Sequence, residues 1–216
     1  MKEVLNPDDF VITRKRKKYR FAKFFNSPLC FEYDEWKRQA VDVVEVGAGT
    51  GLFSVELAAR HPEKTFVAID VKGDRLQKGA YEATARKLTN VRFLRARADQ
   101  IEDLFSARSL GAIWLTFPDP FPRERSARRR MTHPIYLEKY AKLLASDGKF
   151  YLKHDNSAFF EWSLEQLVHE KWRIEELSFN LHESDLPAEY KILTTYETRW
   201  LGEGLTTNFV NATKGN

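Results

Sequence analysis

Residues 41–51 read VDVVEVGAGTG, a short run of mostly β-branched residues followed by three glycines at alternate positions. The apolar run predicts a buried strand of a parallel sheet. Glycines directly after such a strand let the backbone turn sharply and approach a ligand closely, because they carry no Cβ. A helix is predicted over residues 50–60, and Pro62 follows its end. The stretch therefore predicts the strand, glycine loop and helix that open a βαβ unit.

The same alternation of apolar runs and helical segments continues along the chain. Further strands are expected at residues 65–69, 91–94, 112–117, 149–153, 172–180 and 190–201, and further helices at 74–88, 134–145 and 157–170. Strands that alternate with helices predict an α/β fold with a doubly wound, mostly parallel sheet. The last two strands lack a helix between them, so an antiparallel hairpin is expected at the edge. Residues 1–33 precede the pattern as a basic N-terminal arm, and one domain is expected over residues 34–216.

The composition of the 216 residues is that of an ordinary globular chain, with 43% hydrophobic and 31% charged residues. No apolar stretch is long enough to cross a membrane, and the N-terminus has no apolar signal sequence. Cys30 is the only cysteine, which excludes an internal disulfide and a cysteine-based zinc cluster. The five histidines show no metal-ligand spacing. These features predict a soluble cytoplasmic protein with no metal and no membrane partner.

Positive charge is concentrated in two segments of the chain. Residues 1–24 hold eight Lys and Arg against three Asp and Glu, and residues 123–130 hold five Arg and one Glu. Such concentration favours binding of a polyanion over a merely solvated surface. The run at residues 14–20 is a candidate RNA-binding arm, and a solvated tail is the alternative. Its proposed RNA contacts are Arg14, Lys15, Arg16, Lys17 and Lys18.

Acidic residues stand where an adenosine-containing ligand would need them. Asp70 ends the second strand, where a carboxylate can accept both hydroxyls of a ribose. Asp99 follows the third strand and suits an adenine amino group, while Glu45 suits a cationic amine. S-adenosylmethionine carries all three groups and no phosphate. The alternative is a tight turn with ordinary surface acids. The predicted cofactor-binding residues are Glu45, Gly47, Gly49, Gly51, Asp70 and Asp99.

Residues 116–122 read TFPDPFP and follow the fourth strand. The first and fourth strands flank the switch point of a doubly wound sheet, where ligands bind at the carboxyl ends. Asp119 should therefore face the same crevice as the glycine loop. The proline on each side of Asp119 restricts the local backbone. A plain loop followed by solvated arginines is the alternative.

Together these motifs resemble those of the bacterial tRNA (guanine-N7-)-methyltransferases. The resemblance rests on residues 45–51, Asp70, Asp99, residues 118–130 and residues 194–197. It implies a Rossmann-like class I methyltransferase fold with a seven-stranded sheet. It also implies S-adenosylmethionine as methyl donor and a tRNA guanine as acceptor, methylated at N7 in the variable loop at position 46.

The resemblance further implies roles for individual residues. Asp119 would contact S-adenosylmethionine and act as the catalytic residue. A second group would hold the substrate guanosine: Arg123, Asp155, Thr194, Thr195, Tyr196 and Glu197. A third group would contact RNA: Arg125, Arg128, Arg129 and Arg130. The chain departs from the family pattern at Phe121, Arg123, residues 126–127 and His154.

Two other functions stay open at this stage. The chain could methylate a small molecule or a protein, or it could be an RNA-binding or nucleotide-binding module without catalysis. The basic segment beside the predicted donor site favours an RNA acceptor. The presence of Glu45, Asp70, Asp99 and Asp119 together favours catalysis. The sequence leaves the oligomeric state and the preferred tRNAs undetermined.

Overall fold

The computed structural model describes residues 4–9 and 15–214, and eight strands lie in this part of the chain. The strands are β1 (Cys30–Glu32), β2 (Val43–Val46), β3 (Phe66–Asp70), β4 (Val91–Arg95), β5 (Leu110–Thr116), β6 (Leu144–His154), β7 (Trp172–Ser178) and β8 (Asn208–Lys214). The α-helices are α1 (Lys15–Phe25), α2 (Leu52–Arg60), α3 (Gly73–Ala85), α4 (Ile101–Leu104), α5 (Pro134–Leu143), α6 (Ser157–His169) and α7 (Thr195–Leu201). In the described residues, no helix is both long and apolar enough to span a membrane.

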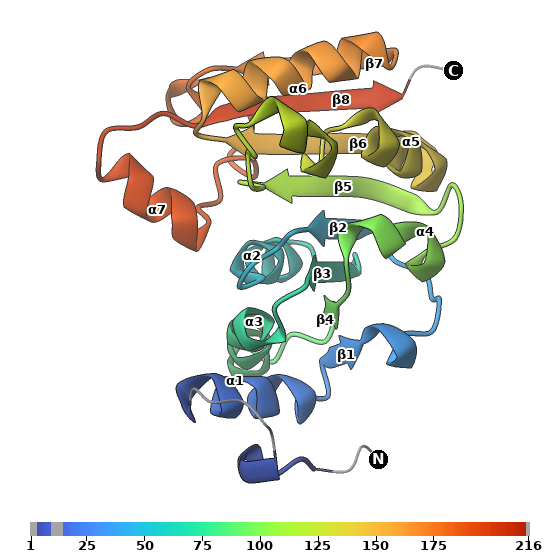
Figure 1. Cartoon of the computed structure of the whole chain (residues 1–216), viewed down its shortest axis with the longest axis vertical. Helices are drawn as coiled ribbons and strands as arrows, with labels where there is room; N and C mark the ends of the chain where they lie inside the picture. The colour runs from blue at the N-terminus through green and yellow to red at the C-terminus, as the bar shows by residue number, and fades with distance from the viewer. Residues whose placement is uncertain (1–3, 10–14, 215–216) are drawn as a thin grey trace.

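All eight strands form one sheet in the order β1-β4-β3-β2-β5-β6-β8-β7 (Figure 1). The strands from β1 to β6 in this order pair in parallel, and β8 runs antiparallel between β6 and β7. Strand β2 lies at the centre of the sheet. The chain continues outward from it through β3 and β4, and then returns to place β5 on the other side of β2. The predicted doubly wound α/β fold is confirmed, and its switch point lies between β2 and β5.

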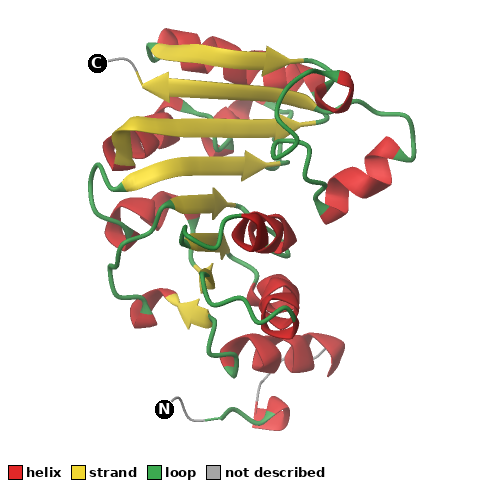
Figure 2. Ribbon diagram, turned by 180° about the vertical axis from the view of Figure 1, so that it is seen from behind, coloured by secondary structure: helices red, strands yellow, loops and turns green. Residues whose placement is uncertain are grey.

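Helices cover both faces of the sheet (Figure 2). Along each central strand, alternate residues enter opposite cores, as the period of two requires. In β2, for example, Val44 packs with α4, α5 and α6, while Val43 packs with α2 and α3. The most buried large side chains include Trp114 of β5 and Tyr140 of α5, one from each core. The strand ends, and the loops that leave them, are therefore set on a rigid support.

The prediction of a strand over residues 190–201 is wrong. Residues 195–201 form α7, which begins with a capping box in which Thr194 and Glu197 bond to each other's backbone N–H groups. The Thr-x-x-Glu spacing is the sequence sign of such a helix start, but the β-branched and aromatic residues around it favoured a strand. The expected antiparallel pairing at the edge is confirmed, because β8 pairs antiparallel with β7. The two strands do not form a hairpin, since α7 lies between them in the chain, where no helix was expected.

Two further elements lie where the sequence analysis expected an arm. Helix α1 packs against α3, and Cys30 of β1 pairs with Phe93 of β4. Phe24 and Cys30 are fully buried. Strand β1 accounts for the eighth strand of the sheet, where the family resemblance implied seven. Residues 15–32 thus pack onto the domain that was expected to begin at residue 34.

Candidate active site

A cavity of about 550 Å³ opens at the carboxyl ends of the central strands. Its first wall consists of the glycine loop after β2 and the end of β3, and its second of the loop after β5, the end of β6 and the start of α7. Glu45 and Asp70 lie on the first wall, and Asp119 and Asp155 lie on the second. The structure thus brings together the glycine loop and Asp119, as the switch-point argument predicts.

The glycine loop turns tightly because its glycines adopt left-handed backbone angles. The φ angle of Gly47 is +75°, and that of Gly51 is +70°. A Cβ on Gly51 would lie 2.7 Å from the ring of Phe93, so this position has no room for a side chain. Gly47 and Gly49 line the cavity, whereas Gly51 packs beneath it. Their roles therefore differ: two open the loop to a ligand and the third seats α2 against the sheet.

Glu45 is buried at the base of the cavity, with 2% of the residue exposed. Its two carboxylate oxygens accept hydrogen bonds from Ser54 Oγ at 2.6 Å and Thr116 Oγ1 at 2.7 Å. Burial raises the pKa of Glu45 to about 7, against the opposing effect of the two hydroxyls. No sequence motif marked Ser54 or Thr116, because each meets Glu45 only in the folded chain. Glu45 is thus a carboxyl group close to its titration point at neutral pH.

Asp70 lies at the end of β3 and joins it to the glycine loop. Its carboxylate accepts the backbone N–H of Gly49 at 2.9 Å and that of Lys72 at 2.8 Å. Burial raises the pKa of Asp70, although these two N–H bonds oppose the shift. A carboxylate offers about four acceptor positions, so about two stay open for hydroxyl groups of a ligand. This is the arrangement that a ribose diol requires.

Asp99 is not brought into the cavity by this structure. Arg97 holds its carboxylate by two hydrogen bonds, at 2.9 Å and 2.7 Å, and the Asp99 side chain is 42% exposed. The hydrogen bond from Arg97 lowers the pKa of Asp99. The expected contact with an adenine amino group therefore has no geometric support in this conformation. The sequence analysis did not consider Arg97, which binds both oxygens of the Asp99 carboxylate.

The loop that carries Asp119 is fixed at both ends by unusual backbone. Phe117 has φ +52° and Phe121 has φ +40°, angles that bulky residues rarely adopt. Such strain persists where the surroundings enforce it, and it is frequent at functional sites. The Phe117 N–H donates to the carbonyl oxygen of Lys153 at 2.9 Å, which ties the loop to β6. Asp119 itself is exposed and faces the cavity.

Buried Arg130 supports the same loop from beneath. Its guanidinium group donates to the carbonyl oxygens of Pro120 at 3.1 Å and Phe121 at 3.2 Å. It also lies 4.3 Å from the ring centroid of Trp162, and the residue is only 9% exposed. Arg130 was expected to contact RNA, and the structure instead uses it inside the fold. The arginine run alone could not reveal this, because Trp162 comes from a distant helix.

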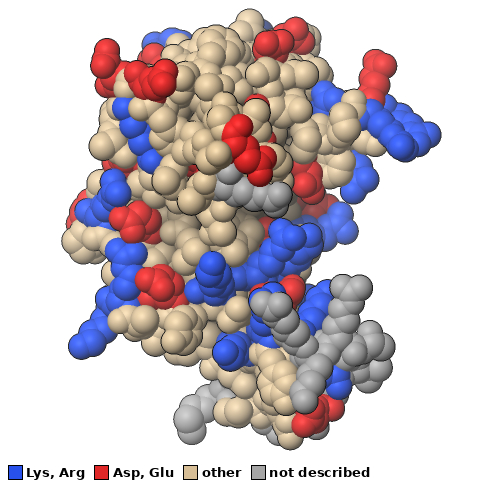
Figure 3. Space-filling model, turned by 90° about the vertical axis from the view of Figure 1, so that its left-hand side faces the viewer, with Lys and Arg blue, Asp and Glu red and all other residues tan. Residues whose placement is uncertain are grey.

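The other basic residues lie on the outside. Arg123, Arg125, Arg128 and Arg129 are exposed, and Arg129 stacks on the ring of Phe121 at 4.3 Å. Figure 3 views the molecule from the side on which α7 lies in Figure 1. Many Lys and Arg side chains are visible on that side. Of the candidate arm, Lys17 is exposed and Lys18 is half-buried on α1. The prediction for Arg14 and the side chains of Lys15 and Arg16 falls outside the described residues.

The expected guanosine-binding residues divide into two groups. Asp155, Thr194, Thr195 and Tyr196 line the cavity, and Tyr196 is 57% exposed with its ring 6.1 Å from that of Phe117. Glu197 is fully buried and turned into the fold, and Arg123 does not line the cavity. An exposed tyrosine beside a cavity offers a flat face on which a base can stack.

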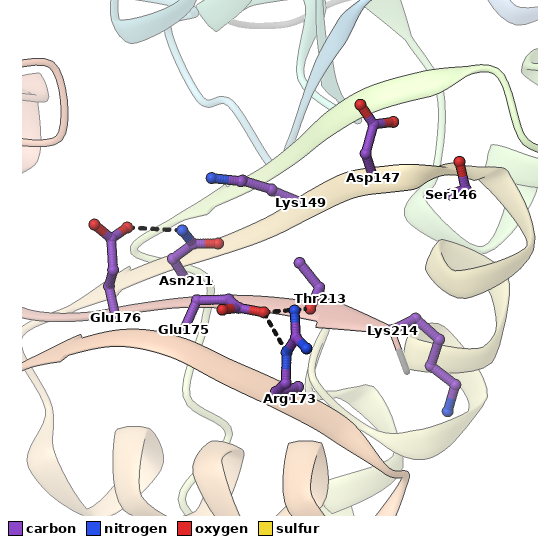
Figure 4. Close-up of a pocket in the computed structure, with 9 residues that line it drawn as sticks. All are labelled: Ser146, Asp147, Lys149, Arg173, Glu175, Glu176, Asn211, Thr213 and Lys214. Carbon is purple, nitrogen blue, oxygen red and sulfur yellow. Dashed lines mark hydrogen bonds and ion pairs between the residues drawn. The ribbon is translucent and has the colours of Figure 1, made fainter. Parts of the chain in front are cut away.

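A second cavity, of about 640 Å³, is lined by residues of β6, β7 and β8 (Figure 4). On β6 these residues lie near the start of the strand, at the end farther from the glycine loop. Polar and charged side chains of both signs line it, among them Lys149, Arg173, Glu176 and Asn211. It has neither a glycine loop nor the carboxyl ends of the parallel strands beside it. In the described residues, no group of three or more His, Cys, Asp or Glu side chains is placed to hold a metal ion.

The fold and the first cavity define a class I S-adenosylmethionine-dependent methyltransferase. Solved structures with this fold agree: the 16S rRNA methyltransferase KamB has a TM-score of 0.63 at 16% identity, covering 85% of this chain and 90% of that chain. An antibiotic-related methyltransferase has a TM-score of 0.60 at 16% identity and covers 99% of this chain and 100% of that one. At this identity the likeness concerns the fold alone.

Sequence comparison identifies the particular family. A family model described as "Putative methyltransferase" matches residues 39–209. A tRNA (guanine-N7-)-methyltransferase of Brevibacillus brevis is 32% identical over 188 residues, 85% of this chain and 87% of the relative. One of Mycoplasmopsis agalactiae is 38% identical over 173 residues, 80% of this chain and 83% of the relative. The chain belongs to the bacterial tRNA (guanine-N7-)-methyltransferase family.

The donor side of the cavity fits S-adenosylmethionine, the methyl donor of this class. The volume lies within the range of small-molecule sites. Asp70 has acceptor positions open for the ribose hydroxyls, and Glu45 can face an ammonium group. The backbone at Gly47 and Gly49 leaves room for close approach. The residues present therefore suit the cofactor, although two of the expected contacts, Gly51 and Asp99, do not line the cavity.

Proposed function

We propose that this chain transfers a methyl group from S-adenosylmethionine to N7 of a guanine in tRNA, at the variable-loop guanine of position 46. The observation that carries the proposal is a single cavity with a carboxylate pair suited to the cofactor on one wall and Asp119, Asp155 and Tyr196 on the other. The activity named for the relatives, at 31–38% identity, gives the acceptor atom.

Different residues of the cavity would bind the cofactor and the guanine. Asp70 orients the ribose, and the Glu45 carboxylate faces the ammonium of the cofactor. Bound S-adenosylmethionine supplies a methyl group on a cationic sulfur. Tyr196 and Thr195 hold the guanine face, and Asp155 accepts from its amino edge. These contacts would hold the guanine with N7 toward the methyl group, since transfer requires reacting atoms that are aligned and about 3–3.5 Å apart.

Guanine N7 carries an exposed lone pair in the plane of the base, so it acts as a nucleophile without loss of a proton. No general base is therefore required. Asp119 instead supplies a fixed negative charge beside the path along which positive charge moves from the sulfur to the purine. The strained backbone at Phe117 and Phe121 and the bonds from Arg130 hold Asp119 in place.

RNA binding falls to exposed arginines beside the cavity and to the basic residues of α1. Arg123, Arg125, Arg128 and Arg129 lie on the loop that leaves the site, so phosphates near the target guanine would meet them. Lys17 belongs to α1, which packs against α3. In the sheet, β3, which precedes α3, lies on one side of β2 and its glycine loop, and β5, which precedes the arginine segment, lies on the other. We place the reaction in the cytoplasm, where tRNA is available.

The test is a methyl-transfer assay with radiolabelled S-adenosylmethionine and unmodified tRNA transcripts. Transcripts with guanine at position 46 should accept label, and matched transcripts with adenine there should not. Borohydride reduction and aniline cleavage of the product then locate N7-methylguanosine in the chain. Label on protein, on small molecules or on rRNA fragments but not on tRNA would replace the proposed acceptor with another.

A further inference from the structure

Lys153 is a fully buried lysine at the carboxyl end of β6. Its Nζ donates to Glu197 Oε2 at 2.7 Å and to the carbonyl oxygen of Ile192 at 2.9 Å, and it lies 5.6 Å from the ring centroid of Phe53. A buried charge is tolerated only when it is paired and hydrogen-bonded. Lys153 satisfies this condition, yet it does not line the cavity.

Its partner, Glu197, gathers four segments of the chain. Besides Lys153, its carboxylate bonds to His182 Nε2 at 2.7 Å, to the hydroxyl of Thr207 at 3.1 Å and to the N–H of Thr194 at 3.1 Å. Burial alone would raise the pKa of Glu197, but the bonds from His182 and Lys153 hold it below its ordinary value. The carboxylate is therefore ionised and fully used within the fold. The carboxylate has no acceptor position left for a substrate.

Helix α7 depends on this carboxylate for its place. The helix stands apart from the sheet (Figure 1) and makes little contact with other helices or strands. Glu197 is its one fully buried charged side chain in the described residues. The same helix carries Thr195 and Tyr196, which line the acceptor side of the cavity. The bond from Lys153 to Glu197 thus links β6 to the helix that carries Tyr196.

We propose that Lys153 is a positioning residue for the methyl acceptor, which acts through Glu197 to hold α7, and with it Tyr196, against the Asp119 loop. The inference rests on the proposed function and refines it. It turns Glu197, which the family resemblance assigns to the substrate, into an anchor that never touches the guanosine. The cofactor half of the cavity is built on β2 and β3, and the hydrogen bonds that hold Asp70 and Glu45 there do not pass through this anchor.

The first measurement is hydrogen exchange followed by mass spectrometry on Lys153→Met. Amides of residues 195–201 should exchange at least about 10-fold faster than in the wild type, while those of β2 to β5 stay unchanged, because only local opening is released. Lys149→Met is the matched control: the same residue type on the same strand and face, but exposed. It should leave exchange in α7 as it is.

The second measurement separates acceptor from donor. Lys153→Met should raise the KM for tRNA or lower kcat by about 10-fold or more, since small misplacements of a reacting partner are costly. Calorimetry should find the affinity for S-adenosylmethionine within about twofold of the wild type. Lys153→Arg, which keeps the charge and a donor, should recover part of the loss.

An unpaired Glu197 could unfold more than α7 in the single variant. Lys153→Met combined with Glu197→Gln leaves no unpaired buried charge, so its exchange pattern isolates the anchor. Unchanged exchange in α7 and unchanged tRNA kinetics in both variants would overturn the proposal. If wild-type protein fails to methylate tRNA, the proposed function fails, and exchange in α7 still decides whether Lys153 anchors the helix.

Discussion

His154 Nε2 lies 2.8 Å from the carbonyl oxygen of Pro118, the residue directly before Asp119. The other ring nitrogen, Nδ1, accepts the backbone N–H of Asn156, also at 2.8 Å. Because Nδ1 accepts, Nε2 must carry the proton and donate to Pro118. The ring is therefore neutral, and burial lowers the pKa of His154 below its ordinary value of 6.5. One side chain of β6 thus links the end of its own strand to the loop that carries Asp119.

Replacement of His154 should loosen this loop without disturbing the cofactor site. We expect His154→Leu to lower kcat about 10-fold, because Asp119 loses a fixed reference, with the affinity for S-adenosylmethionine unchanged. His154→Gln keeps a neutral donor of similar reach and should retain most of the rate. Equal rates for His154→Leu and the wild type would show that the Pro118 contact is dispensable.

The other ring nitrogen of His154, Nδ1, gives a pH dependence with a defined sign. A proton on Nδ1 would face the Asn156 N–H and favour Asp155, whose Oδ1 lies 3.2 Å away. Because the folded pKa of His154 lies below 6.5, the bond from the Asn156 N–H to Nδ1 is complete above pH 6.5 and is lost as the pH falls through the folded pKa, while Nε2 keeps its proton and its bond to Pro118. The acid limb of kcat against pH should be shallower in His154→Gln, which cannot titrate.

Glu45 should make the free protein less stable at high pH. Its pKa is about 7 in the folded protein against an ordinary 4.5, so the folded state keeps the proton that the unfolded chain loses. The free energy of unfolding should therefore fall as the pH rises from about 4.5 to 7. Glu45→Gln removes the charge, and we expect it to be more stable than the wild type by about 2–4 kcal/mol at pH 8 and similar at pH 4.

Urea unfolding at both pH values measures this difference. The variant should also bind S-adenosylmethionine more weakly, because a neutral amide cannot balance an ammonium group. A Glu45→Gln protein that is less stable than the wild type at pH 8 would mean that the two hydroxyl bonds outweigh the cost of burying the charge.

Two neighbouring arginines should behave in opposite ways. Arg128 is exposed, so Arg128→Ala should weaken tRNA binding and reduce the salt slope of log Kd by roughly 0.7–0.9 for one lost phosphate contact. Arg130 is buried on the loop carbonyls, so Arg130→Ala should instead lower the free energy of unfolding by about 1–3 kcal/mol.

Filter binding over a range of salt concentrations and urea unfolding distinguish the two effects. A reduced salt slope in Arg130→Ala with unchanged stability would place that side chain on RNA after all.

Asp70 and Asp99 form a natural pair for testing the cofactor site. Asp70→Ala should weaken S-adenosylmethionine binding by about 1.5–3 kcal/mol, the range for hydrogen bonds to a charged group. Asp99 lies outside the cavity and is held by Arg97, so Asp99→Ala should cost less than Asp70→Ala. Calorimetry at fixed pH measures both affinities. Equal losses would mean that Asp99 leaves Arg97 when the cofactor binds.

The strand ends of the sheet could be predicted because they are local signals. An apolar run that ends in glycines, or in Asp70, marks both the strand and the place where its carboxyl end opens. The start of α7 also had a local signal, the capping box of Thr194 and Glu197, but the strand-forming residues around it obscured the signal.

Long-range partners could not be predicted in the same way. The bonds from Thr116 to Glu45 and from Lys153 to Glu197 join residues that are distant in sequence and meet only in the folded chain. A lysine at the end of a strand carries no sign that it will be buried. Local patterns therefore located the cavity, whereas the contacts that shape it depended on the fold.

Asp119 is the residue on which catalysis should depend most directly. Methyl transfer moves positive charge from the sulfur to the purine, and a fixed carboxylate beside that path stabilises the charge where it develops. We expect Asp119→Ala to lower kcat about 10²–10³-fold, the scale for loss of one preorganised electrostatic group. Asp119→Asn should lose nearly as much, because it keeps the shape and removes the charge.

Turnover must be measured at saturating S-adenosylmethionine, since Asp119 also lines the cofactor cavity and its loss can weaken donor binding. Binding of tRNA should persist in both variants, because we propose that the exposed arginines of residues 123–129 supply it. If Asp119→Asn is as slow as Asp119→Ala, the negative charge is what the reaction requires. If it retains the wild-type rate, a hydrogen bond that orients one of the two substrates is sufficient, and if Asp119→Ala also retains it, other residues alone position the reaction.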